Sequence, residues 1–252
     1  MNNSAQHTLN KVPEITLIFW IIKIAATTLG ETAGDAVSMS MNLGYLVGTF
    51  IFAAVFLVAV IAQIKAKGFH PYLYWTTIIA TTTVGTTLAD FTTRSLGIGY
   101  LGGSSMLFTL LMISLIIWHR TLGTISVNSI SSPKSELFYW ITIMFSQTLG
   151  TALGDWTSDT AGFGYAGGAL VFSGLLLLVA AAYYWTHISR TMLFWFAFIL
   201  TRPLGAVVGD FLDKPTSHGG LDLSRYSASL VLLVFMLVCI VIFKQKAAKV
   251  AH

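Results

Sequence analysis

Residues 19–35, with the sequence FWIIKIAATTLGETAGD, contain the pattern that decides the fold. It begins with an aromatic residue and Trp20, continues as an apolar run, and ends at Asp35, fifteen positions after the tryptophan. The same pattern and spacing return in residues 74–90, 139–155 and 194–210. Because recurrence at a fixed spacing is typical of a repeated structural unit, the sequence predicts four tandem copies of one unit.

A glycine–tyrosine pair begins the second half of the first three units, and another apolar run follows it. The pair recurs at residues 44–45, 99–100 and 164–165. The fourth copy instead has a charged insert at residues 213–220, which we expect to form a lid or a cluster of salt bridges between repeats. Each copy therefore contains two apolar runs. The expected repeats are approximately residues 14–66, 70–121, 135–187 and 190–245.

The composition favours a membrane protein, because 55% of the residues are hydrophobic and only 10% are charged. Soluble domains have about 25% charged residues, and a membrane span needs about 20 mainly apolar ones. Eight stretches qualify: 14–35, 45–64, 71–90, 100–119, 137–155, 164–186, 190–210 and 226–243. We therefore expect an all-α integral membrane protein with eight transmembrane helices in a single domain, residues 1–252. Two crossings per repeat would relate the copies by an axis along the membrane normal.

The basic residues indicate an orientation. Most of them fall at one side of the expected bundle: Lys11, Lys65, Lys67, Arg120, Lys134, Arg190, Lys244, Lys246 and Lys249. The positive-inside rule then places both termini in the cytoplasm. The basic residues do not cluster with aromatic ones, so the formal charge of +4 does not indicate nucleic-acid binding. A lone cysteine, Cys239, cannot form a disulfide within the chain.

Four two-helix repeats with an aromatic–Trp start and a Gly-x-x-x-Gly-Asp end resemble a bacterial membrane-protein family catalogued as a repeat of unknown function. The resemblance covers nearly the whole chain. It implies the architecture described above and a location in the bacterial inner membrane. It implies no activity.

The repeat aspartates are the main candidates for a functional site. Fifteen helical residues span about 22 Å, so all four acids lie at one depth near one end of the spans. Helical spacing adds Glu31 and five threonines to the same face. The expected substrate-binding or ion-binding residues are Asp35, Asp90, Asp155, Asp210, Glu31, Thr28, Thr83, Thr86, Thr148 and Thr151. Lys23 and Arg202 are expected to compensate charge or to gate.

Ionisable groups at membrane depth normally pair with one another or mark an ion pathway. Carboxylate and hydroxyl oxygens suit hard cations, so the five acids are the expected metal ligands. The expected function is secondary transport of a small divalent cation such as manganese or magnesium, with export and proton coupling left open. Neither enzymatic activity nor a cofactor is expected, because no hydrolase or protease motif is present.

Other interpretations remain open from the sequence. Each aspartate also suits a role in capping a helix end or the turn after it. The acids could serve an organic-cation carrier or a channel, or dock a partner on a scaffold or sensor that transports nothing. The small-residue faces suit helix packing within one chain or in a homo-oligomer. We expect the repeat tryptophans to anchor the protein at the membrane interface.

Overall fold

The computed structural model describes residues 11–127, 130 and 132–248, and within them the protein is all-helical, with no strand. Four helices carry the first half of each repeat: α2 (Leu17–Asp35), α4 (Pro71–Asp90), α6 (Pro133–Asp155) and α8 (Arg190–Asp213). Four more carry the second half: α3 (Gly44–Lys65), α5 (Gly99–Leu122), α7 (Gly164–Trp185) and α9 (Arg225–Ile242). The expected alternation of two helices per repeat is confirmed.

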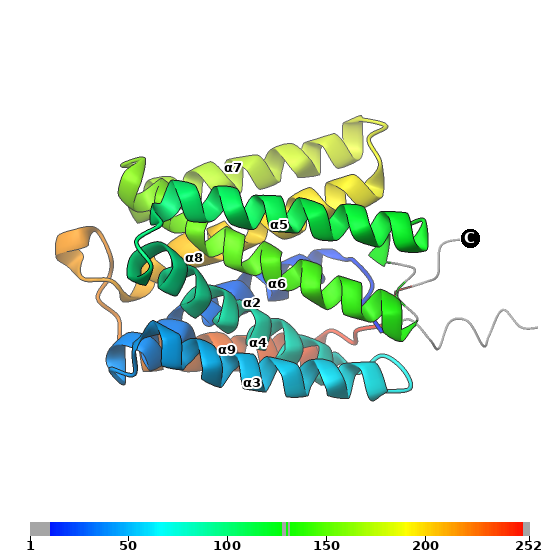
Figure 1. The fold of residues 1–252 in the computed structure, drawn as a ribbon, viewed down its shortest axis with the longest axis horizontal. Coiled ribbons are helices and arrows are strands. Elements are labelled where there is room, and N and C mark those ends of the chain that lie inside the picture. The colour runs from blue at the N-terminus through cyan, green and yellow to red at the C-terminus, as the bar shows by residue number, and fades with distance from the viewer. Residues whose placement is uncertain (1–10, 128–129, 131, 249–252) are drawn as a thin grey trace, which may run out of the picture.

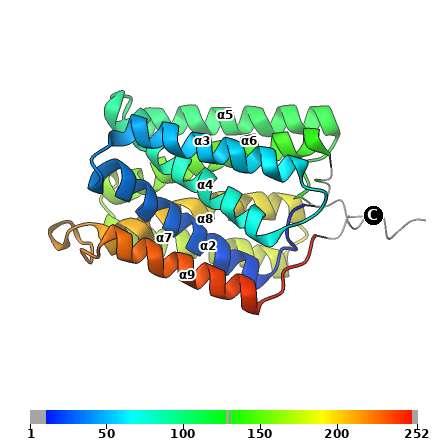
Figure 2. The same cartoon turned by 90° about the horizontal axis from the view of Figure 1, so that it is seen from below.

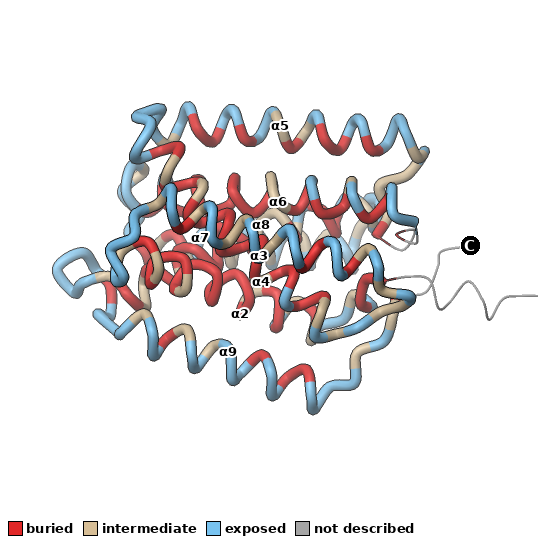
Figure 3. The backbone as a smooth tube through the Cα atoms, turned by 60° about the horizontal axis from the view of Figure 1, so that its bottom comes forward, coloured by how far each residue is buried: buried red, intermediate tan, exposed pale blue. Residues whose placement is uncertain are grey.

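Six of these helices are long and apolar enough to cross a membrane, which indicates a membrane protein. The two that fall short are α4 and α6, whose sequences contain many threonines and other polar residues. Both belong to the interior of the bundle, where most of their residues are buried against other helices (Figure 3). Their polar side chains are therefore shielded by protein.

The first-half helices form a closed inner ring. In it α2 packs on α4, α4 on α6, α6 on α8, and α8 on α2 (Figures 1 and 2). Each second-half helix packs mainly on the inner helix of the next repeat: α3 on α4, α5 on α6, α7 on α8, and α9 back on α2. The packing is therefore cyclic, and the last of the described helices, α9, covers the first, α2.

Glycines allow the inner helices to approach closely. A Cβ atom added to Gly30 would lie 2.1 Å from the hydroxyl of Thr82, and one added to Gly205 would lie 2.2 Å from that of Thr27. The other two copies of this position, Gly85 and Gly150, face the matching residues of the next repeats in the same way. Small residues are what bring membrane helices into contact, so these glycines fix the spacing of the ring.

The tryptophans lie at one end of the bundle, and the interface-anchor prediction is wrong for those that are fully buried. Trp75 is 1% exposed and Trp140 is 2% exposed. They pack with the preceding aromatic residues, and the hydroxyls of Tyr74 and Tyr139 meet at 2.6 Å between α4 and α6. At this end the large contacts between these rings join the inner helices, and this packing buries the rings.

The two ends of the described chain meet at the same aromatic end. Pro13 and Ala247 form an isolated antiparallel bridge, and Lys11 makes an ion pair with Glu136 at 2.6 Å. Lys249, one of the basic residues assigned to this side, lies outside the described residues.

At the opposite end, the first three repeats differ from the fourth. After Asp35, Asp90 and Asp155 the chain continues directly as a five-residue π-helix: Ala36–Ser40, Phe91–Ser95 and Trp156–Thr160. None of these three aspartates caps its π-helix with its side chain, so the capping interpretation is not supported. In the fourth repeat α8 continues past Asp210 to Asp213, and the insert forms a projecting loop, drawn in orange at the left of Figure 1.

Candidate functional site

The four repeat aspartates lie at the π-helix end of the inner ring, and all are buried. Asp35 is fully buried, and the other three are each 2% exposed. They do not form one evenly spaced ring of free acids. Two basic side chains divide them into two pairs, each pair joining adjacent repeats.

Arg94 bridges the first pair. Its Nε lies 3.1 Å from Asp90 Oδ1, and its Nη2 lies 3.2 Å from Asp155 Oδ2. A third donor, Nη1, reaches the hydroxyl of Tyr45 at 3.4 Å. The guanidinium therefore neutralises acids from α4 and α6 together.

Lys214 bridges the second pair in the same way. Its ammonium donates to Asp35 Oδ2 and lies 3.1 Å from Asp210 Oδ1. Burial by itself would lower the pKa of Lys214, but the carboxylates of Asp210, Asp35 and Asp213 outweigh it and raise the pKa well above the usual value for lysine. The paired carboxylates therefore favour the charged form of Lys214.

Arg94 and Lys214 are equivalent residues of the two halves, because they stand 120 positions apart, as Asp90 and Asp210 do. We call the two groups the Arg94 clamp (Arg94, Asp90, Asp155) and the Lys214 clamp (Lys214, Asp210, Asp35). Neither basic residue was among the expected site residues. The insert that contains Lys214 was, however, expected to form a lid or salt bridges between repeats, and Lys214 makes such a bridge with Asp35. The signal was present in the repeat spacing, since each basic residue stands four residues after an aspartate.

A second charged layer lies one helical turn deeper. Arg202 is fully buried, and its Nη2 donates to Glu31 Oε2 at 2.8 Å and to the Thr86 hydroxyl at 2.6 Å. The same nitrogen donates to Thr151. Glu31, Thr86 and Thr151 occupy the same position in three successive repeats, so the arginine of the fourth repeat lies at the centre of the ring. Its expected role as a compensating charge for Glu31 fits these contacts.

Lys23, the other expected compensating residue, lies deeper still. It is fully buried, with its ammonium 4.2 Å from the centre of the Phe198 ring and 3.5 Å from Gln147 Oε1. Within the described residues it makes no ion pair, so the structure does not place it against an acid.

The five expected threonines separate into two groups. Thr86 and Thr151 meet Arg202, as described above. The hydroxyls of Thr28, Thr83 and Thr148 donate to backbone carbonyls one turn earlier in their own helices, at 2.9–3.0 Å. Such bonds satisfy a hydroxyl locally. The structure therefore brings only two of the five to the charged centre.

Three acids come close enough together to hold one cation. Glu31, Asp35 and Asp210 each offer an oxygen, and these oxygens all lie within 4.8 Å of one another. Glu31 and Asp35 stand one turn apart on α2, and Asp210 comes from the neighbouring α8. Asp90 and Asp155 are not part of this group. We call the group the acid triad.

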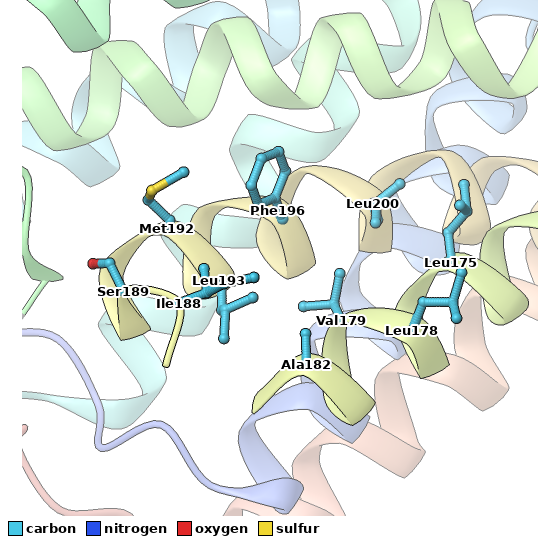
Figure 4. Close-up of a pocket in the computed structure, with 10 residues that line it drawn as sticks. All are labelled: Leu175, Leu178, Val179, Ala182, Ile188, Ser189, Met192, Leu193, Phe196 and Leu200. Carbon is cyan, nitrogen blue, oxygen red and sulfur yellow. The ribbon is translucent and has the colours of Figure 1, made fainter. Parts of the chain in front are cut away.

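The grooves on the bundle surface do not coincide with these acids. A groove of about 610 Å³ lies between α7 and α8 and is lined almost entirely by apolar side chains, among them Leu178, Met192 and Phe196 (Figure 4). It contains no acid and only one hydroxyl, that of Ser189. Its chemistry suits hydrocarbon and offers nothing to an inorganic cation.

The family model described as Repeat of Unknown Function (DUF347) matches residues 18–69, 73–124, 138–189 and 193–246. The chain belongs to this family. The four matches of the repeat family follow one another along most of the chain, in agreement with the resemblance drawn from the sequence. No curated protein and no solved structure matches the chain. The function therefore has to be argued from the site itself.

Proposed function

We propose that the protein is a secondary transporter of a small inorganic cation, which binds at the acid triad. The observation that carries this proposal is the grouping of three buried carboxylates, with oxygens within 4.8 Å of one another, at one end of the inner ring. Buried acids at membrane depth are costly unless they pair or bind an ion. Oxygen-only ligands favour hard cations.

The charged residues below the triad support the same proposal. Arg202 is bonded to Glu31, the innermost acid of the triad, and Lys23 lies about two turns below Glu31 in the same helix. These groups lie among the four inner helices, away from the lipid-facing surface. A charged interior of this kind is what an ion pathway needs, while a purely structural bundle gains little from it.

We further propose that all eight helices span the inner membrane of a bacterium, with the aromatic end and both termini in the cytoplasm. The threonine-rich α4 and α6 are enclosed by other helices, so they do not need apolar surfaces of their own. Basic residues at the ends of α3 and α5 and at the starts of α6 and α8 fit the positive-inside rule. The acids then face the outer side.

A flux assay tests the transport proposal. The full-length protein in liposomes is screened with Mn²⁺, Mg²⁺, Ca²⁺, Na⁺ and protons, together with D35N and D210N. Each variant should lower flux of the transported ion at least about tenfold, the usual effect of disturbing a metal site. D222N is the matched control, because Asp222 is exposed just after the insert and its substitution removes the same charge. Equal flux in D35N and wild type would contradict the proposal.

One observation favours a second candidate, a scaffold that transports nothing. All four repeat aspartates already contact a basic side chain, which is also the expected state of a static salt-bridge layer. In that case no ion moves through liposomes containing folded protein, and D35N lowers only the free energy of unfolding. The same assay, with an unfolding measurement beside it, separates the two.

A further inference from the structure

We infer that the acid triad takes a divalent cation in exchange for the ammonium of Lys214, which holds the site as a tethered competitor. This inference rests on the proposed transport function and specifies how its site is filled and emptied. It assigns a role to the insert of the fourth repeat, which distinguishes that repeat from the other three.

The contacts of Lys214 show a cation already held by the triad. Its ammonium contacts Asp35 and Asp210, two of the three acids, while the third acid, Glu31, pairs with Arg202. Asp35 Oδ1 is buried and has no hydrogen-bond partner among the described residues. The group therefore keeps a free, buried ligand oxygen beside the bound ammonium, and an ion with a higher coordination number would use it.

The charges of the group select a divalent ion. When all three carboxylates are ionised they contribute −3, and Arg202, bonded to Glu31, contributes +1, which leaves −2. Lys214 cancels only one of these charges. A divalent cation that displaces the ammonium would cancel both, whereas Na⁺ would leave the same residual charge as lysine does. Arg225 lies 3.9 Å from Asp35 but pairs more closely with Asp213, at 3.1 Å, and the charges of Arg225 and Asp213 cancel.

The backbone also favours displacement of Lys214 over displacement of Arg94. Arg94 lies inside the π-helix Phe91–Ser95, and its planar fork contacts two acids and a tyrosine. Lys214 directly follows the end of α8, in extended backbone at the start of the insert. A lysine is a single charge on a flexible stem, so it leaves its partners more readily than a forked arginine does. The exchangeable cation is therefore the one on the loop.

Mn²⁺ binding to the purified full-length protein in detergent tests the exchange. K214M removes the competitor, so its affinity for Mn²⁺ should rise about tenfold or more, equivalent to at least ~1.4 kcal/mol. R94M is the matched control: it removes the equivalent basic residue from acids outside the triad, and its affinity should change less than about threefold. Unchanged affinity in K214M, or an equal rise in both variants, would overturn the inference.

A measurement on the wild-type protein tests the same exchange without relying on variants that must fold. Saturating Mn²⁺ should free the Lys214 amine, so its rate of modification by an amine-reactive reagent, followed by mass spectrometry, should rise. Equal rates with and without Mn²⁺ would overturn the exchange. If liposomes nevertheless show ion flux that D35N abolishes, the transport proposal survives without the exchange. If no ion binds and none moves, both fail.

Discussion

The Arg94 clamp and the Lys214 clamp occupy equivalent positions in the two halves of the protein, yet their surroundings differ. Arg94 is backed by Tyr45 and lies in a continuous helix. Lys214 lies on a loop. Its partners Asp35 and Asp210 are grouped with an extra acid, Glu31, and a third basic residue, Arg225, lies 3.9 Å from Asp35. The comparison teaches that one repeated position can serve as a fixed link in one half and as a replaceable cation in the other.

The largest effect on the free energy of unfolding is expected when the basic residue of each clamp is removed in turn. R94M leaves Asp90 and Asp155 buried without a basic partner, and losing one partner of a buried ion pair typically costs 3–5 kcal/mol. Because the Arg94 side chain is 31% exposed, we expect the low end, about 3 kcal/mol off the free energy of unfolding. K214M should cost roughly half as much, since Arg225 remains near Asp35.

Reversible unfolding in mixed detergent micelles measures both values. R94K is the control that keeps the charge at this position. A larger loss for K214M than for R94M would show that Lys214, and not Arg94, is the fixed link.

Exchanging lysine and arginine between the two clamps should show more closely how they differ in their effect on Mn²⁺ affinity. K214R places a forked cation on Asp35 and Asp210, so the triad should become harder to open and Mn²⁺ affinity should fall about tenfold. R94K, in the clamp outside the triad, should leave the affinity nearly unchanged. Isothermal titration of the two variants and wild type gives the answer. A higher affinity in K214R would mean that Lys214 assists the ion in binding instead of competing with it.

The smallest effect is expected at the rim of the Arg94 clamp. The hydroxyl of Tyr100 donates to Asp159 Oδ2 at 3.1 Å, in an exposed position. Y100F should therefore lower the free energy of unfolding by about 0.5 kcal/mol and leave cation flux unaltered. Y226F, at a tyrosine of α9 outside this rim, is the matched substitution. A strong loss of flux in Y100F alone would make this rim part of the substrate path.

Much of the fold follows from the sequence, because the interval from Trp20 to Asp35 repeats without change and sets the register of the inner helices. The membrane character follows from composition. The same repeat spacing also shows that Arg94 and Lys214 are equivalent residues, so the basic residues of both clamps could have been predicted from the sequence. It could not show which acids of adjacent repeats each clamp brings together, because that depends on which helix faces lie together.

The five predicted threonines show what helical spacing alone cannot decide, namely which side chains reach the charged centre. Thr28, Thr83 and Thr148 fit the expected stripe, yet their hydroxyls bond within their own helices, whereas Thr86 and Thr151 meet Arg202. Residues three positions apart on a helix differ in direction by about 60°, which decides whether a side chain reaches the centre of a narrow ring. That direction depends on how tightly the glycines let the helices pack.

The cyclic packing of outer helices also has a consequence for biosynthesis. The face of α2 that α9 covers has no partner until α9 has left the ribosome, and the face that meets α8 has none until α8 has done so. Among the described helices, α2 is thus the first to be synthesised and packs on the two that are synthesised last. Since the two described ends of the chain meet at Pro13 and Ala247, a chain joined there and cut between two other repeats would keep the same contacts while assembling in a different order.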